Sequence, residues 1–88
     1  MIKVISVRTL EYQPGCVLIQ EHRLDRPVDM LILSFLASGA DLQLLHDGSE
    51  THFQIEKPGA YVIQGVLGQD RYRISTVPVQ QAETWQVA

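Results

Sequence analysis

The sequence predicts a small all-β protein, an antiparallel β-sandwich of about seven strands with a meander in its C-terminal half. Turn-forming residues recur at intervals of about ten residues, which is typical of sandwiches and barrels. The segments between them have strand length. A partly open barrel is the alternative. The turn signals are Pro14-Gly15, Asp25-Arg26-Pro27, Ser38-Gly39, Asp47-Gly48, Pro58-Gly59 and Gly68-Gln69.

No linker, repeat or low-complexity tract divides the chain, so we predict one domain over residues 1–79 and a C-terminal tail or arm over residues 80–88. The candidate strands are residues 2–10, 16–23, 28–37, 41–46, 51–56, 60–67 and 71–79.

The strongest local signal is the hairpin around Asp47-Gly48, a dipeptide that suits the two positive-φ positions of a type I′ turn. The expected register places apolar residues of both strands on one face, with the pairs His46–Ser49, Leu44–Thr51 and Leu42–Phe53. Pro58-Gly59 then predicts a type II turn, and Gly68-Gln69 a type II′ hairpin. Residues 41–79 are therefore expected to form four antiparallel strands in sequence.

Residues 28–37 fit two templates. Val28, Leu31, Ile32, Phe35 and Leu36 follow helical spacing, with Asp25 available as a cap, Pro27 near the start and Gly39 beyond the end. A helix here would nevertheless be apolar almost all round, and the neighbouring segments suggest strands. We therefore prefer a strand and keep the helix as the alternative.

As a strand, this segment and residues 60–67 would be apolar on both faces, whereas a two-layer protein of 88 residues has one core to fill. A partner chain is the simplest cover for the second face. The polar tail also ends in two alternating apolar residues suited to docking on a sheet edge. We therefore predict a homo-oligomer, or a complex with another structural protein, through Leu31, Leu33, Phe35, Trp85 and Val87.

Composition argues against several classes of function. The net charge is −3 and the seven Lys and Arg residues are dispersed, so we expect no nucleic-acid partner. Apolar runs such as Met30 to Leu33 are far shorter than the ~20 residues that span a bilayer, and no secretion signal is recognisable. We expect a soluble protein of the cytoplasm, or of a virion if viral, without a membrane partner. Cys16 lies beside an apolar run and is expected to be buried.

The chemically interesting residues are few. His46 and His52 are close in sequence but fall on opposite faces of the expected hairpin, so we predict no metal site and no cofactor. Arg71 and Arg73 share one face of the last strand and suit an anionic group. Nucleophile elbows and phosphate-binding glycine loops are missing from the sequence, so we predict no catalytic residues and no enzyme.

The leading hypothesis is a non-enzymatic structural or interaction module that self-assembles or docks on a larger particle. Small sandwiches with a terminal arm are similar, by analogy of class, to virion accessory proteins of tailed phages, including capsid decoration, adaptor and tail components. The alternative is a carbohydrate or small-ligand module using His46, His52, Arg71 and Arg73, with Tyr12, Tyr61 and Tyr72 as sugar-stacking candidates.

A weaker alternative is a metal-dependent enzyme, because the hairpins of residues 39–65 resemble those of small cupin barrels. The metal motif of that family needs a closely spaced histidine pair, a carboxylate and a third histidine downstream. No such array follows His46 or His52, and the resemblance therefore implies no metal ligands here.

Overall fold

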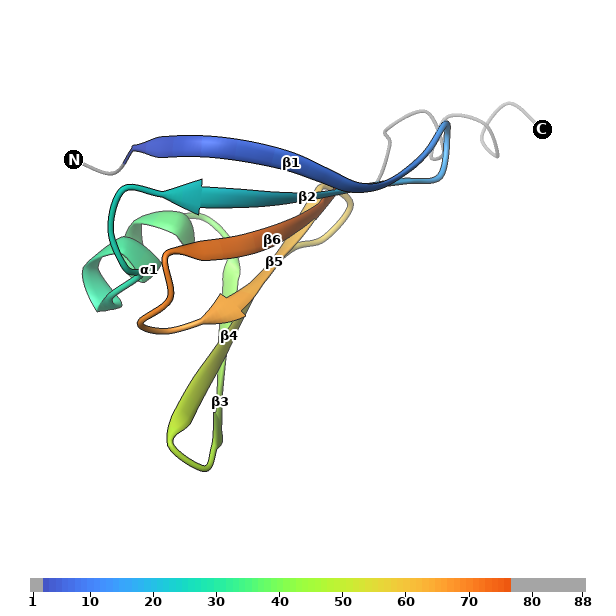
Figure 1. The fold of residues 1–88 in the computed structure, drawn as a ribbon. Helices are drawn as coiled ribbons and strands as arrows, with labels where there is room; N and C mark the ends of the chain where they lie inside the picture. Colours follow the sequence, from blue (N-terminus) through green and yellow to red (C-terminus); the bar gives the residue numbers. More distant parts are fainter. Residues whose placement is uncertain (1–2, 77–88) are drawn as a thin grey trace.

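The computed structural model describes residues 3–76, which form six antiparallel strands and one short helix (Figure 1). The elements are β1 (Val4–Gln13), β2 (Val17–Leu24), α1 (Met30–Leu36), β3 (Asp41–Asp47), β4 (Glu50–Lys57), β5 (Tyr61–Val66) and β6 (Arg71–Thr76). All six strands belong to one sheet in the order β1-β2-β6-β5-β4-β3, and this sheet is not closed into a barrel. The predicted small antiparallel all-β fold is confirmed, with six strands in the described residues where about seven were predicted, and with α1 rather than a second sheet packed on this sheet.

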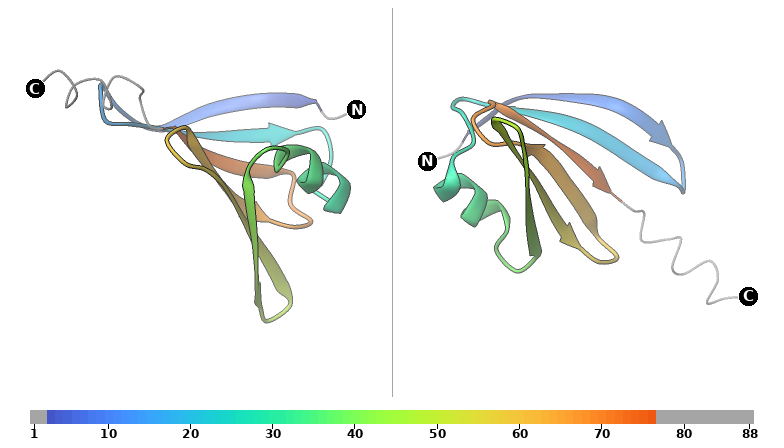
Figure 2. Two further views of the ribbon diagram at one scale, coloured as in Figure 1. Left: turned by 180° about the vertical axis from the view of Figure 1, so that it is seen from behind. Right: turned by 90° about the horizontal axis from the view of Figure 1, so that it is seen from below.

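The sheet is strongly twisted, and the β3–β4 hairpin runs steeply across the direction of β1 and β2 (Figure 1). Helix α1 packs on one side of this sheet (Figure 2), which we call the helix face. Tyr72, Ile63 and Phe53 lie on the helix face, since they are buried with the apolar residues of α1. The opposite side, called the open face, carries the intervening side chains, including Arg71 and Arg73.

The predicted meander is confirmed as far as the described residues extend, because β3, β4, β5 and β6 are consecutive in the sheet as well as in the chain. The β4–β5 turn has the expected chemistry. The Ala60 N–H donates to the Lys57 carbonyl at 3.0 Å, and Gly59 takes a φ of +78° at the third turn position. A type II turn requires a positive φ there.

The β3–β4 turn lies one residue later than predicted. Asp47 pairs with Glu50, so the two loop residues are Gly48 and Ser49. Gly48 has a φ of +63° and no other residue type in the described chain has a positive φ, which rules out a type I′ turn. The shift moves the register by two positions and brings Leu44 opposite Phe53 instead of Thr51. Apolar residues thereby face each other, and the side of the hairpin on which they lie is unchanged.

The β5–β6 connection also differs from the prediction. Gly68 occupies the third position of its turn, where the Gln69 N–H donates to the Val66 carbonyl at 3.2 Å, so a type II′ hairpin is wrong. This loop is longer because it binds another segment. The Gly68 N–H donates to the Val28 carbonyl at 2.9 Å, and the Val28 N–H donates to the Gln69 carbonyl at 2.8 Å.

The strand preferred for residues 28–37 is wrong: Met30–Leu36 is helical. The N-cap is Asp29, whose side-chain oxygen accepts a hydrogen bond from the Ile32 N–H at 2.9 Å. Beyond the helix, Gly39 has a φ of +76°, which ends the regular structure before β3. Local capping therefore outweighs the apolar character that favoured a strand.

The core lies between α1 and the middle of the sheet. Its buried members are Leu24, Val28, Ile32, Leu33, Phe53, Ile55, Ile63 and Tyr72. Gly65 makes room for this packing, because a Cβ atom built there would lie 2.6 Å from Cζ of Phe53. The core is thus centred on β4, β5 and β6, and the outer strands β1 and β3 lie at its margins.

Candidate functional site

The outer side of α1 is an apolar surface exposed to solvent. Each residue of an α-helix is rotated by 100° from the one before it. This rotation places four residues in order around the exposed side of α1, namely Met30, Ser34, Leu31 and Phe35, and three of the four are apolar. Leu31 is 79% exposed and Phe35 is 71% exposed. We call Met30, Leu31 and Phe35 the helix arc. Side chains of this size are usually turned toward a core, so the helix arc is the clearest candidate contact surface in the described chain.

The structure divides the predicted interface residues. Leu31 and Phe35 are exposed together on the helix arc. Leu33 is 0% exposed and belongs to the core, so its assignment to an interface is wrong. The reason is the helix itself, since a rotation of 100° per residue turns Leu33 inward beside Ile32. Trp85 and Val87 lie outside the described residues.

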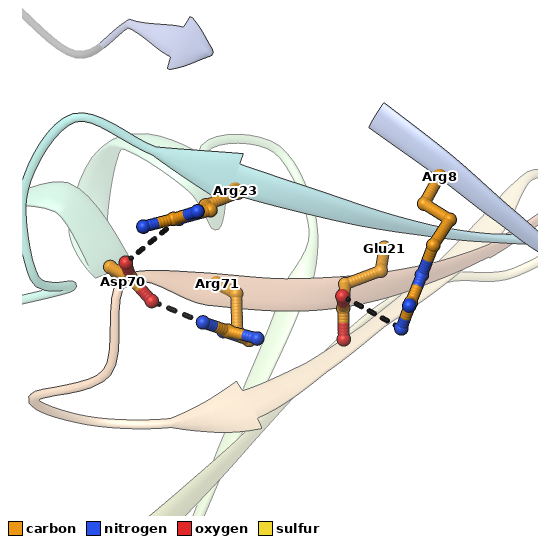
Figure 3. A network of polar contacts seen from close by, with 5 residues as sticks. All are labelled: Arg8, Glu21, Arg23, Asp70 and Arg71. Carbon is orange, nitrogen blue, oxygen red and sulfur yellow. Dashed lines mark hydrogen bonds and ion pairs between the residues drawn. The ribbon is translucent and has the colours of Figure 1, made fainter. Parts of the chain in front are cut away.

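The open face carries a transverse row of polar residues, one from each strand. The register places Gln43 opposite Gln54, Gln54 opposite Gln64 and Gln64 opposite Arg73, and the row continues through Glu21 to Arg8. Nε2 of Gln64 donates to Oε1 of Gln54 at 3.0 Å, and Arg8 forms an ion pair with Glu21 at 3.2 Å (Figure 3). We call these six residues the polar row.

Two of the charges in the polar row are already paired, and one is not. Arg8 and Glu21 neutralise each other, whereas the Arg73 side chain makes no hydrogen bond or ion pair with any residue of the described chain. Arg73 is therefore the guanidinium in this row that can bind a carboxylate or a phosphate.

The curved open face forms an open hollow of about 860 Å³, lined by all the residues of the polar row except Arg8. Its lining includes His52, Arg71 and Arg73, so the structure brings together three of the four predicted ligand residues. The fourth, His46, is separated from them, because it lies on the same side of β3 as Leu44 and contacts Thr51 Oγ1 at 3.0 Å. His46 is thus not part of this hollow, and its assignment to a shared ligand site with His52 is wrong.

Asp70 joins two arginines at one end of the sheet (Figure 3). Its carboxylate oxygens accept from Nε of Arg71 at 3.1 Å and from Nε of Arg23 at 3.2 Å. These hydrogen bonds, that of Arg71 first, lower the pKa of Asp70 below its ordinary value. Because Asp70 partly neutralises Arg71, an incoming anion meets less positive charge than the sequence suggests.

His22 and Tyr72 form the most buried polar contact of the sheet. Nδ1 of His22 and the Tyr72 hydroxyl share a hydrogen bond of 3.2 Å, and the ring centroids are 5.3 Å apart. Burial lowers the pKa of His22 and raises the pKa of Tyr72, so both side chains stay neutral near pH 7. Nε2 of His22 is buried without a hydrogen-bond partner in the described chain.

The structure gives less support to a metal site, a buried cysteine or a sugar-stacking surface. Within residues 3–76, no group of three or more His, Cys, Asp or Glu side chains is arranged to hold a metal ion. Cys16 is exposed rather than buried, because β2 begins after it and Cys16 belongs to the preceding turn. The tyrosines form no stacking platform, since Tyr72 is buried in the core and Tyr12 is exposed on β1.

Sequence reasoning missed the three glutamines of the polar row and Met30 of the helix arc. Each glutamine is part of the ordinary alternation of polar and apolar residues along its strand. Their alignment in one row depends on the register of neighbouring strands. That register depends on the exact positions of the turns, which local sequence signals do not fix.

Comparisons with known proteins provide no family assignment. No family model matches the chain, and neither a curated protein nor a solved structure is detectably similar to it. Among the described residues, no helix is long and apolar enough to cross a membrane.

Proposed function

We propose that this chain is a non-enzymatic structural module that self-assembles through the helix arc. The observation that carries the proposal is the exposure of Leu31 and Phe35, side by side on a helix of seven residues. Burying these two side chains in a contact would remove a large apolar area from water. Each Å² of apolar area buried stabilises the contact by roughly 25 cal/mol. The origin of the protein, including membership of a phage virion, stays a prediction.

The geometry of α1 supports a contact role for this surface. The opposite side of the helix already fills the core through Ile32 and Leu33, so the helix arc is not needed for folding. Large aromatic and aliphatic side chains of this kind commonly anchor protein interfaces. An apolar helix arc without a folding role is best explained as a surface that another protein covers.

The test is the solution mass, measured by light scattering over a tenfold range of concentration. We expect the mass of the native protein to exceed 9.9 kDa, and Phe35→Asp to lower that mass with an unchanged circular dichroism spectrum. Phe35→Leu is the matched control, because it keeps an apolar side chain and should retain the assembly. A native chain that stays at 9.9 kDa throughout, or an assembly that Phe35→Asp leaves intact, would refute the proposal.

A second candidate function is the binding of a small anionic ligand in the open-face hollow. The specific observation is that Arg73, Arg71 and His52 line one hollow, with Arg73 unpaired in the described chain. Glutamine amides beside them add donors and acceptors for hydroxyl groups. This arrangement suits a small carboxylate or an acidic sugar better than a neutral glycan, because no exposed aromatic ring lines the hollow.

Amide chemical shifts recorded during titration with citrate and with glucuronate would test this candidate. We expect saturable shifts at residues 64–73 that Arg73→Gln abolishes and Lys57→Gln preserves, since Lys57 lies outside the hollow. Shifts that do not saturate, or that persist in Arg73→Gln, would remove this function.

A further inference from the structure

We infer that copies of this chain also join edge to edge, with β1 of one copy adding to β3 of the next as a continuation of the antiparallel sheet. This inference rests on the proposed function, since it concerns self-assembly, and it specifies a second contact that is independent of the helix arc. Neither outer edge is paired with another strand within residues 3–76, and we assign a second copy of this chain as the occupant of each. β1 and β3 form the two opposite borders of the sheet (Figure 2).

The topology makes such a contact geometrically direct. Each neighbouring pair in the order β1-β2-β6-β5-β4-β3 is antiparallel, so β1 and β3 run in opposite directions. A second copy placed beside the first in the same orientation therefore presents β3 antiparallel to β1. The helix face of one copy continues into the helix face of the next, as a continuous sheet requires.

In one register of β1 against β3, opposite charges, apolar residues and polar residues are each set opposite one another. When Arg8 of one copy faces Asp41 of the next, the pairs that follow are Val7–Leu42, Ser6–Gln43 and Val4–Leu44. Ile5 is the extra residue of a bulge between Val4 and Ser6. Because of this bulge, Val4 lies on the same face as Leu44 when the two are opposite each other. The contact then consists of one ion pair, two apolar pairs and one polar pair, each on the correct face.

The side chains of these pairs are available for the contact. Val4, Val7, Leu42 and Leu44 are all exposed in the single chain. β3 is regular along its whole length, since all seven of its residues pair with β4; it contains no Lys, Arg or Pro, and its two carboxylates, Asp41 and Asp47, lie at its ends. β1 has two bulges, between Val4 and Ser6 and between Thr9 and Glu11, and this register uses the segment from Val4 to Arg8, which includes the first of them.

Charge favours the β1–β3 contact over the pairing of two β3 edges. The β3–β4 hairpin has four carboxylates, namely Asp41, Asp47, Glu50 and Glu56, against the single cation Lys57. β1 and β2 together balance two arginines against two glutamates. Two β3 edges would bring two acidic hairpins together, whereas β1 sets Arg8, which is also ion-paired with Glu21 of its own copy, opposite Asp41. The contact is heterologous, so it generates a ring or an open filament rather than a closed dimer.

Disulfide trapping in full-length protein tests this contact directly. A Val7→Cys protein and a Leu42→Cys protein, both carrying Cys16→Ser, are oxidised separately and as a mixture. We expect a covalent dimer in the mixture and little in either protein alone, because each single variant lacks a cysteine on the opposing edge. Gln54→Cys replaces Val7→Cys as the control, since Gln54 lies on the open face of an inner strand. A mixture that cross-links no better than this control overturns the inference, as does equal cross-linking of Val7→Cys alone.

A charge exchange gives a second measurement. Arg8→Asp and Asp41→Arg should each raise the concentration of half-association about fivefold, because each sets like charges opposite one another. The double variant restores an opposite pair and should return to within about twofold of the native value. If the double variant instead has a concentration of half-association raised by the product of the two single effects, the register is contradicted.

Phe35 lies on neither edge, which keeps the two proposals separable. If Phe35→Asp lowers the solution mass but trapping fails, the edge contact is wrong and the helix-arc contact stands. If trapping succeeds and Phe35→Asp changes nothing, the proposed helix-arc function fails and the edge contact stands.

Discussion

The Nδ1 atom of His22 lies 3.2 Å from the hydroxyl oxygen of Tyr72, joining two strands that are fifty residues apart in the sequence. The two residues are direct partners in the β2–β6 register. Their contact is on the helix face, where burial holds both side chains in their neutral forms. A protonated His22 would be charged in this environment, with its Nε2 atom buried and unpartnered in the described chain.

His22 should make the stability of the fold depend on pH. Burial lowers the pKa of His22 in the folded chain below its ordinary value of 6.5, so the unfolded chain binds more protons than the folded chain as the pH falls below that value. The free energy of unfolding should therefore decrease on acidification from pH 7, until the pH falls below the folded pKa. His22→Leu should remove this part of the slope in urea titrations. His52→Gln, at a half-buried position on β4, should keep it, and equal slopes for native and His22→Leu proteins would contradict the assignment.

Neighbouring leucines of α1 should differ sharply in their effect on stability. Leu33→Ala removes a fully buried side chain and should lower the free energy of unfolding by about 2–5 kcal/mol. Leu31→Ala removes an exposed one and should change it by about 0.5 kcal/mol or less in dilute, dissociated protein. Urea denaturation at low protein concentration measures both. Similar losses for the two variants would argue against this orientation of the helix.

Gly65 should tolerate no side chain. An added Cβ atom would lie 2.6 Å from Cζ of Phe53 and 3.2 Å from Cβ of Tyr72, and both of these residues are buried. We expect Gly65→Ala to cost about 1–3 kcal/mol through overpacking. Gln64→Ala on the adjacent open face is the control and should stay within about 0.5 kcal/mol of the native stability. A native-like melting temperature for Gly65→Ala would show that the Phe53 ring can move aside.

The cap of α1 should be measurable through Asp29. Asp29→Ala removes the acceptor of the Ile32 N–H bond and should reduce stability by about 1 kcal/mol. Asp29→Ser retains a capping oxygen and should recover most of that loss. Thermal melts followed by circular dichroism provide the comparison, and an alanine variant as stable as the native chain would show that the cap contributes little.

The all-β class and the meander were predictable because their signals are local. Pro58-Gly59 specifies its turn through the φ that each residue prefers, and alternating apolar residues mark the strands around it. The hairpin at Gly48 was placed one residue off because Asp47-Gly48 and Gly48-Ser49 both suit a tight turn. The observed register sets Leu44 opposite Phe53 and Leu42 opposite Ile55, so it pairs more apolar residues than the predicted one.

The helix and the candidate surfaces were less predictable because they depend on distant segments. Val28 fits the helical stripe in sequence, yet it lies before the helix and is bonded to the Gln69 region. Without that anchor, the buried side of α1 cannot be inferred from spacing; the sequence pattern assigns Leu33 to the interface because a strand would place it on one face with Leu31 and Phe35. Likewise, Arg71 and His52 meet in one hollow through the register of β4, β5 and β6, which no short motif encodes.

The central position of β6 has a consequence for how the chain acquires its fold. β6 is the last described strand in sequence, yet it is the strand that connects the β1–β2 hairpin to the β3–β4–β5 meander. During synthesis these two parts emerge from the ribosome before residues 71–76 can join them. The complete sheet must therefore form late, after nearly the whole described chain is available, and its slow step should be the long-range closure of β2 against β6.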